Sequence, residues 1–215
     1  MEPLSAEQLD LVALRTVERS FQKGESVYLL GDASEAVFFL LVGRVRLYGT
    51  VRERELTFDV IRAGAMFGEA SLTERTQNEY AQALEPSRVG LLDLNTFWHL
   101  VRENFEFNAR VIKVLGERSR TTKGRMTDIA LKEVPARLAG LVLDLVQGEG
   151  VVTRDGNYLV PARYTHEQLA SMIGVKRVAV TRAFGDLQDS GCIQLRRRQI
   201  YVVDLAALKG LAAGG

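Results

Sequence analysis

The chain of 215 residues is long enough for one large domain or two small ones, each with its own hydrophobic core. Its composition, 47% hydrophobic and 26% charged with a net charge of +1, is ordinary for a globular protein, and no apolar run approaches a membrane span. The single cysteine excludes an internal disulfide framework and a multi-cysteine metal site. The polar N-terminus does not resemble a secretory signal, so we expect a cytoplasmic protein.

The segment from Glu25 to Asp93 predicts short β-strands separated by turns. β-branched and aromatic residues recur in it, and glycines punctuate the apolar runs. This pattern is typical of a compact all-β sandwich or barrel. The stretch LVGRVRLYG predicts a hairpin whose side chains alternate between the two faces. Its inward residues are Val45 and Leu47, and its outward residues are Arg44, Arg46 and Tyr48.

Helical patterns follow the strands. A short helix is expected over Asn95–Asn104, and a long, proline-free helix over Phe107–Leu131. The long helix carries a roughly heptad stripe of Val111, Val114, Leu115, Met126 and Ile129, continued by Arg118, Thr122 and Arg125. Such a stripe favours a partner helix in a homodimer, although a helix lying on its own β-domain would show a similar pattern. Pro135 predicts a break before the next helix.

Residues 134–215 predict a second domain that runs helix, hairpin, two helices, hairpin and a short final helix. Asp155 and Gly156 between two β-rich runs are a strong hairpin signal. This part of the chain holds more Lys and Arg than Asp and Glu, and three of the cations are contiguous at 196–198. The charge hints at a nucleic-acid partner.

A helix-turn-helix is predicted between Thr165 and Leu187. Thr165 and Gln168 have the spacing of a capping box at the start of the first helix, and the second helix is expected to begin at Lys176. Between the two helices, Gly174 allows a tight turn.

Three residues of this segment have the spacing that the helix-turn-helix requires. Ala170 is small where the helices touch, Gly174 permits a positive φ, and Val180 is β-branched where the second helix packs down. The inward face of the second helix is expected to consist of Val180, Ala183, Phe184 and Leu187. With cations on the opposite face, the pattern predicts binding to double-stranded DNA.

The outward face of the second helix predicts how DNA is read. Arg177 and Arg182 could each bind guanine in bidentate fashion or bind phosphate. Val178 has no hydrogen-bonding group, so it either contacts a thymine methyl or packs against the preceding turn. The residues expected to contact DNA are Thr165, His166, Lys176, Arg177, Val178, Thr181, Arg182, Arg196, Arg197 and Arg198.

From about Phe21 to Leu205 the chain resembles the cyclic-AMP receptor / fumarate-nitrate regulator family of bacterial transcription factors. The stretch KRVAVTRAFGDL looks most like the nitrogen-control regulator subgroup. The resemblance implies an α+β fold with a cyclic-nucleotide-binding-like β-roll domain (1–106), a long dimerisation helix and hinge (107–133) and a winged helix-turn-helix domain (134–215). It also implies a homodimer on a palindromic site whose half-sites lie about one helical turn apart.

The resemblance also marks an effector position that this chain has changed. In the cyclic-AMP branch a Gly-Glu pair is followed, about ten residues later, by an Arg-Ser pair that holds the cyclic phosphate. Gly68 and Glu69 are present here, but Glu79 and Tyr80 stand where the Arg-Ser pair would be. Because a carboxylate repels a phosphate, we do not expect cyclic-nucleotide binding in the usual manner.

The other branches of the family are matched only in part. Arg118 matches a long-helix arginine that holds a dicarboxylate effector in the nitrogen-control branch, but its partner Glu is Lys123 and the β-roll arginine is again Glu79. Thr122 matches a position that contacts adenine, and both Arg118 and Thr122 would also fit a polar dimer seam. The missing cysteines exclude iron–sulfur sensing. The candidate effector residues are Gly68, Glu69, Glu79, Tyr80, Arg118, Thr122 and Lys123.

Three effector hypotheses stay open. The protein needs no ligand, binds an unfamiliar small molecule in the β-roll, or binds the family's ligands at a rebuilt site. We favour the first, with no cofactor. Val178 also replaces the base-reading Glu of the cyclic-AMP and fumarate-nitrate branches, so their target sequences are not expected here.

Other functions fit the sequence less well. A cupin-type enzyme needs clustered His and carboxylate ligands, and residues 25–93 contain no histidine. No catalytic triad, P-loop or dinucleotide-binding glycine motif is present, so we expect no enzyme. The tip formed by Arg154, Asp155 and Gly156 resembles a loop that contacts RNA polymerase, which favours an activator, although the sequence does not separate activation from repression.

Overall fold

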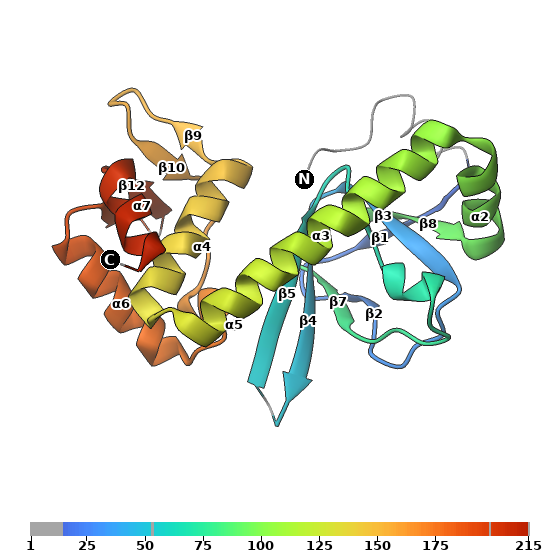
Figure 1. The fold of residues 1–215 in the computed structure, drawn as a ribbon, viewed down its shortest axis with the longest axis horizontal. Helices are drawn as coiled ribbons and strands as arrows, with labels where there is room; N and C mark the ends of the chain where they lie inside the picture. Colours follow the sequence, from blue (N-terminus) through green and yellow to red (C-terminus); the bar gives the residue numbers. More distant parts are fainter. Residues whose placement is uncertain (1–14, 53, 198, 215) are drawn as a thin grey trace. The chain divides into compact units, whose positions relative to one another are not determined.

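The computed structural model describes residues 15–52, 54–197 and 199–214 (Figure 1). The chain divides into two compact units, whose boundary falls between Thr122 and Lys123 of the long helix α3 (Phe105–Leu131), and Arg52–Leu56 group with the second unit. The first is called the β-roll unit below and the second the C-terminal unit.

The β-roll unit contains two four-stranded sheets, as the spacing of strands and glycines predicts. The strands of the first sheet, in spatial order, are β1 (Val17–Phe21), β8 (Ser87–Asp93), β3 (Ala36–Val42) and β6 (Met66–Phe67). Those of the second are β2 (Ser26–Tyr28), β7 (Tyr80–Ala83), β4 (Arg44–Val51) and β5 (Arg54–Arg62). Side chains of both sheets, among them Leu40 and Leu47, share one buried cluster.

The predicted hairpin over LVGRVRLYG is wrong. The chain turns at Gly43, but β3 and β4 belong to different sheets, so the turn is a crossing between layers. Gly43 has a φ of 93°, and a Cβ there would lie 2.3 Å from Ser87 Oγ and 2.7 Å from the Pro86 carbonyl oxygen. The close approach of the β8 end therefore requires glycine at this position.

The alternation along β4 is correct for Val45 and Leu47, which are buried. Tyr48, expected to point outward, is also buried, because its ring stacks on Tyr80 of β7 with centroids 5.1 Å apart. An amphipathic ring can cover the outer side of a strand where another ring meets it.

Strand β1 was not predicted. Its sequence, VERSF, has no alternation of apolar and polar residues, and four of its five residues are exposed. It forms as an edge strand because its backbone pairs with β8, from Val17–Leu91 to Phe21–Ser87. Such pairing leaves no period-two signal when neither face is buried.

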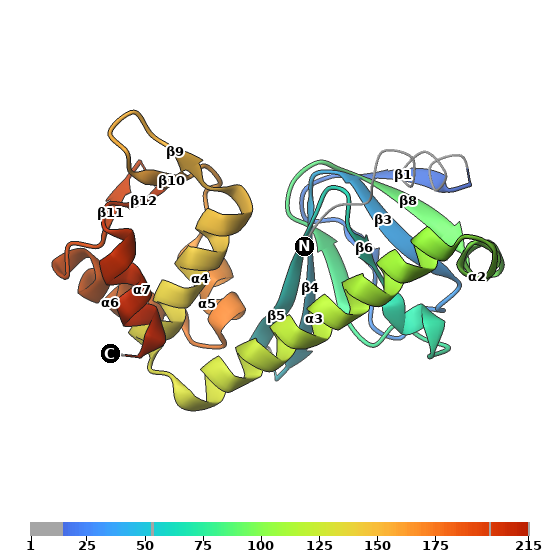
Figure 2. The same cartoon turned by 45° about the horizontal axis from the view of Figure 1, so that its top comes forward.

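Helix α2 (Leu94–Glu103) leads into α3, whose first half packs on the β-roll unit (Figure 2). Phe107, Val111 and Val114 are buried in one cluster with Phe97 of α2, and Leu115 packs against it. For this half of the helix, the alternative of a helix lying on its own β-domain is correct. A second face of α3 stays exposed in the described chain, with Ile112 and Met126 each 65% exposed.

The C-terminal unit places four helices around a four-stranded sheet. Its helices are α4 (Val134–Glu149), α5 (His166–Ile173), α6 (Arg177–Asp189) and α7 (Leu205–Ala213). Its strands, in spatial order, are β11 (Ile193–Arg196), β12 (Gln199–Val202), β10 (Tyr158–Val160) and β9 (Val151–Val152). Pro135 lies in the first turn of α4, as predicted. No helix in the described ranges is long and apolar enough to cross a membrane.

Candidate DNA-binding surface and β-roll cluster

Helices α5 and α6 form the predicted helix-turn-helix. The Thr165 hydroxyl accepts a hydrogen bond from the Gln168 amide (3.1 Å), and the Gln168 side chain accepts one from the Thr165 amide (2.8 Å), so the capping box is complete. Helix α5 ends at Gly174 in the left-handed region, with φ 70°. The Val175 amide then donates to the Ala170 carbonyl at 3.0 Å, which closes the turn.

The inner side of α6 is packed as expected, with Val180, Ala183, Phe184 and Leu187 buried. Sequence reasoning missed Arg137 of α4, whose guanidinium donates to the Ile173 carbonyl at 3.1 Å. This contact satisfies a carbonyl at the C-terminal end of α5 and places a cation where the helix dipole favours one. No local spacing could have indicated the pair, because 36 residues separate them.

The outer side of α6 carries the predicted reading residues. Lys176, Arg177, Thr181 and Arg182 are exposed. Lys176 is the N-cap of α6 and its side chain makes no capping bond. Val178 is 62% exposed, so it does not pack away against the preceding turn. The helix thus presents two arginines, a lysine and a valine on one accessible surface.

His166 and Thr181 are joined across the two helices. The imidazole Nδ1 lies 2.9 Å from Thr181 Oγ1, and that hydroxyl donates to the Arg177 carbonyl at 3.2 Å. The His166 ring also stacks on Phe184, with centroids 5.1 Å apart and planes at 19°. The sequence predicted both residues as DNA contacts but not their link.

The wing is the β11–β12 hairpin. Arg196 pairs with Gln199 across the strands, and its guanidinium lies 5.3 Å from the Tyr201 ring centroid. Arg197 occupies the turn with φ 51° and is exposed. Arg198, the third predicted wing cation, lies outside the described residues. Arg196 at the end of β11 and Arg197 in the turn are therefore both accessible in the wing.

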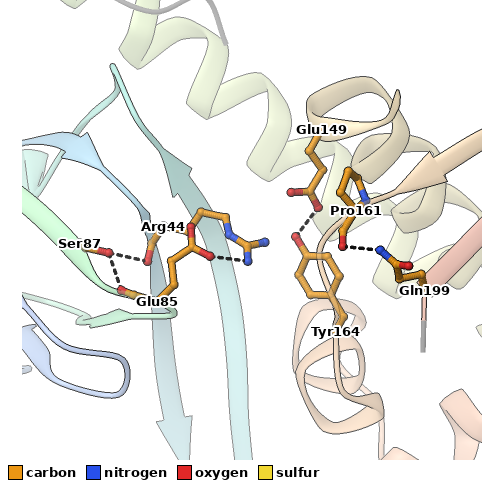
Figure 3. Close-up of polar contacts among 7 residues, drawn as sticks. All are labelled: Arg44, Glu85, Ser87, Glu149, Pro161, Tyr164 and Gln199. Carbon is orange, nitrogen blue, oxygen red and sulfur yellow. Dashed lines mark hydrogen bonds and ion pairs between the residues drawn. The ribbon is translucent and has the colours of Figure 1, made fainter. Parts of the chain in front are cut away.

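The segment before α5 is held from two sides (Figure 3). The Tyr164 hydroxyl donates to Glu149 at the end of α4 (2.6 Å), and the Gln199 side-chain amide donates to the Pro161 carbonyl (2.9 Å). These bonds connect the first helix of the motif with α4 on one side and with the wing on the other.

The predicted polymerase-contact residues lie at the tip between β9 and β10, which pair as an antiparallel hairpin. Arg154, Asp155 and Gly156 are exposed. The Thr153 amide donates to the Asn157 carbonyl at 2.8 Å, and Gly156 has a φ of 78°, which suits glycine.

In the β-roll unit, Arg118 of α3 is held by groups of the same chain. Its guanidinium pairs with Glu69, donates to the Met66 carbonyl at 2.9 Å and lies 3.8 Å from the Asp59 carboxylate. The Arg118 side chain is 12% exposed. Its charge is thus already balanced inside the protein, at the start of the 3₁₀ helix η1 (Glu69–Leu72).

Glu79 lies in the same group of charges. It accepts a hydrogen bond from the Tyr28 hydroxyl at 3.1 Å. Burial, followed by the nearby negative charge of Glu69, raises the pKa of Glu79 to about 7. Burial and Glu79 likewise raise the pKa of Tyr28 above its ordinary value. We call Tyr28, Asp59, Glu69, Glu79 and Arg118 the β-roll cluster.

The structure brings together four of the seven candidate effector residues. Glu69, Glu79 and Arg118 meet, and Gly68 precedes η1 with φ 73°, where a Cβ would lie 2.5 Å from the Phe38 ring. Tyr80 instead stacks on Tyr48, and Thr122 and Lys123 are exposed on α3. Tyr28 and Asp59 were missed, since Tyr28 is 51 residues from Glu79. The described residues include no group of three or more His, Cys, Asp or Glu that could hold a metal ion.

Comparison with known proteins covers both units. The model of the Crp-like helix-turn-helix domain matches residues 136–211, and that of the cyclic nucleotide-binding domain matches residues 18–104. The global nitrogen regulator of Nostoc sp. is 27% identical over 199 residues, which are 91% of this chain and 89% of the relative. The CRP-like cAMP-activated global transcriptional regulator of Mycobacterium tuberculosis is 26% identical over 189 residues, 86% and 83% of the two chains.

Among solved structures, a CRP-family transcriptional regulator from Thermus thermophilus superimposes with a TM-score of 0.76 at 25% identity, over 91% of this chain and 96% of that one. These relatives, which match 86% or more of this chain, are all named as regulators. With its complete helix-turn-helix, the chain belongs to the cyclic-AMP receptor / fumarate-nitrate regulator family of DNA-binding transcription regulators.

Proposed function

We propose that the protein is a cytoplasmic transcription activator that binds a palindromic promoter site as a homodimer and needs no cyclic nucleotide. The observation that carries the effector part is the β-roll cluster. Glu79 stands where the family resemblance calls for a phosphate-binding arginine, and Arg118 is neutralised by Glu69. A cyclic phosphate would meet carboxylates with no uncommitted cation in the cluster.

The relatives are named for two different signals, nitrogen and cAMP, so their names alone do not choose an effector. In this chain the Glu69 carboxylate already balances the charge of Arg118, so Arg118 does not need a bound anion as its partner. The proposed activity therefore depends on the amount of protein rather than on a nucleotide or a 2-oxoglutarate-like acid.

The proposed dimer uses the exposed face of α3. Ile112, Gly116, Ser119 and Met126 are exposed and follow one another at heptad-like spacing. The two small residues allow close approach of a second helix, and Ile112 and Met126 supply apolar contact. This seam differs from the stripe that the sequence suggested, because Val111 and Val114 are buried against the β-roll unit.

Selection of bound sites from a random DNA pool tests the proposal. We expect a palindrome with half-sites about one helical turn apart. Gel shifts on that site, with and without cyclic nucleotides or 2-oxoglutarate, should then give the same affinity. A tenfold change with one ligand, about 1.4 kcal/mol of coupling, would contradict the effector-free part alone. Enrichment of a single unrepeated half-site would contradict the homodimer.

A further inference from the structure

The hydroxyl of Thr181 is used twice inside the protein. Its oxygen lies 2.9 Å from His166 Nδ1, and it donates to the Arg177 carbonyl at 3.2 Å. A threonine has one hydroxyl hydrogen. Because that hydrogen is directed to the carbonyl, the contact with His166 requires the imidazole hydrogen on Nδ1. Thr181 therefore has no hydrogen left to donate to a base.

The His166 ring is well placed to hold Thr181. His166 is the first residue of α5, directly after the N-cap Thr165, and its ring stacks on the buried Phe184 of α6 with centroids 5.1 Å apart. Threonine in a helix divides between two side-chain rotamers. A fixed donor on one side favours the rotamer that turns the oxygen toward His166, and the methyl group is then the part of the exposed Thr181 left for a ligand.

Val178 lies three residues before Thr181, so the two side chains are neighbours on one face of α6. Val178 is 62% exposed. We propose that His166 is a specificity-determining residue, which holds Thr181 so that its methyl group and Val178 form an apolar surface that recognises thymine 5-methyl groups. This inference rests on the proposed DNA site and names what part of that site is read.

The chemistry of the major groove favours this assignment. The thymine methyl is the apolar group that distinguishes a base edge there, whereas a free threonine hydroxyl would accept or donate to several bases. Because the Thr181 hydroxyl is bonded inside the protein, its methyl group is left to contact the base, and thymine is the base with a matching apolar group. Burial of one methyl group corresponds to about a fourfold gain in affinity.

The test uses the full-length protein and the site selected from the random pool. Each thymine of the half-site is replaced in turn by deoxyuridine, which removes only the 5-methyl group. We expect the wild-type affinity to fall about fourfold at one or two thymines of each half-site. Wild-type affinity that is unchanged at every thymine overturns the proposal.

Thr181→Val and Thr181→Ser form a matched pair. Valine keeps a methyl group and loses the hydroxyl, whereas serine keeps the hydroxyl and loses the methyl group. We expect the deoxyuridine penalty to persist in Thr181→Val and to disappear at one thymine in Thr181→Ser. The reverse pattern, or the same penalty in both variants, overturns the proposal.

His166→Asn and His166→Leu separate the donor from the packing. Asparagine retains an N–H near the position of Nδ1, and leucine retains apolar contact with Phe184, so we expect both variants to fold, which their melting temperatures check. We expect a penalty of about fourfold in His166→Asn and below twofold in His166→Leu, with other bases accepted at that position. A full penalty in His166→Leu overturns the role of His166. Failure to select any site would instead contradict the proposed function.

Discussion

At the scale of single residues, Glu79 makes stability depend on pH. Its folded-state pKa, about 7, is above the ordinary value of 4.5 because of burial and the charge of Glu69. The favourable contribution of the protonated group is complete below pH 4.5 and is lost as the pH rises through 7. The shift corresponds to roughly 3 kcal/mol as an upper bound.

Glu79→Gln should therefore flatten the fall in unfolding free energy between about pH 5 and pH 8, because glutamine is neutral throughout and can still accept from Tyr28. Urea unfolding at the two pH values checks this. Glu74→Gln, an exposed position in the same unit, is the control and should leave the slope of wild type. If the unfolding free energy depends on pH equally in Glu79→Gln and in wild type, Glu79 does not titrate between about pH 5 and pH 8.

The arginines of the C-terminal unit predict two kinds of DNA contact. Arg177 begins α6, where recognition-helix side chains reach base edges. Arg177→Ala should cost about 1–3 kcal/mol and relax specificity at one base pair. Arg196→Ala in the wing should weaken binding to all DNA sequences alike. It should also reduce the slope of log affinity against log salt concentration by about one. Titrations on the selected site and on single-base variants at two salt concentrations distinguish the two, and a uniform loss in Arg177→Ala would make it a phosphate contact.

At the scale of elements, the helix-turn-helix depends on Gly174. Its φ of 70° is unfavourable for residues with a Cβ, so Gly174→Ala should destabilise the protein by about 1 kcal/mol. Gly185 lies within α6 and a Cβ there would meet nothing within 4 Å. Gly185→Ala should thus be neutral or stabilising by up to about 1 kcal/mol. Chemical unfolding measures both, and equal effects would argue against a strained turn.

The β9–β10 hairpin predicts a separation of transcription from DNA binding. Asp155 and Gly156 are exposed at its tip. Asp155→Ala and Gly156→Ala should reduce transcription in vitro while the gel-shift affinity stays that of wild type. Normal activation by both variants would show that this tip makes no contact that transcription requires.

The success of sequence reasoning also differs between elements. The helix-turn-helix was predicted almost to the residue, because its caps and turn depend on neighbours within a few positions. Strand β1 was missed because its order comes from backbone pairing with β8 and not from its own pattern. The predicted hairpin at Gly43 was wrong because the turn there connects strands of two different sheets. The sequence around Gly43 does not indicate this, since it depends on the distant residues of β8.

At the scale of the whole molecule, the exposed face of α3 predicts the oligomeric state. Ile112→Glu or Met126→Glu places a charge in the proposed seam and should shift the protein from dimer to monomer in sedimentation velocity, with weaker binding to the palindrome. Val152→Glu, at another exposed apolar position, should stay dimeric. Dimers that persist in both α3 variants would place the interface elsewhere.

The sequence by itself predicted the family, through its resemblance to known regulators, and the outward face of α6 that we expect to meet DNA, since the caps and turn residues of the helix-turn-helix lie close together along the chain. The tertiary structure decided which side of α3 is buried and what surrounds the effector position. Arg118 pairs with Glu69 from 49 residues away, and Tyr28 meets Glu79 across 51. It also joined His166 to Thr181. Such contacts depend on how distant segments pack, and no local spacing encodes them.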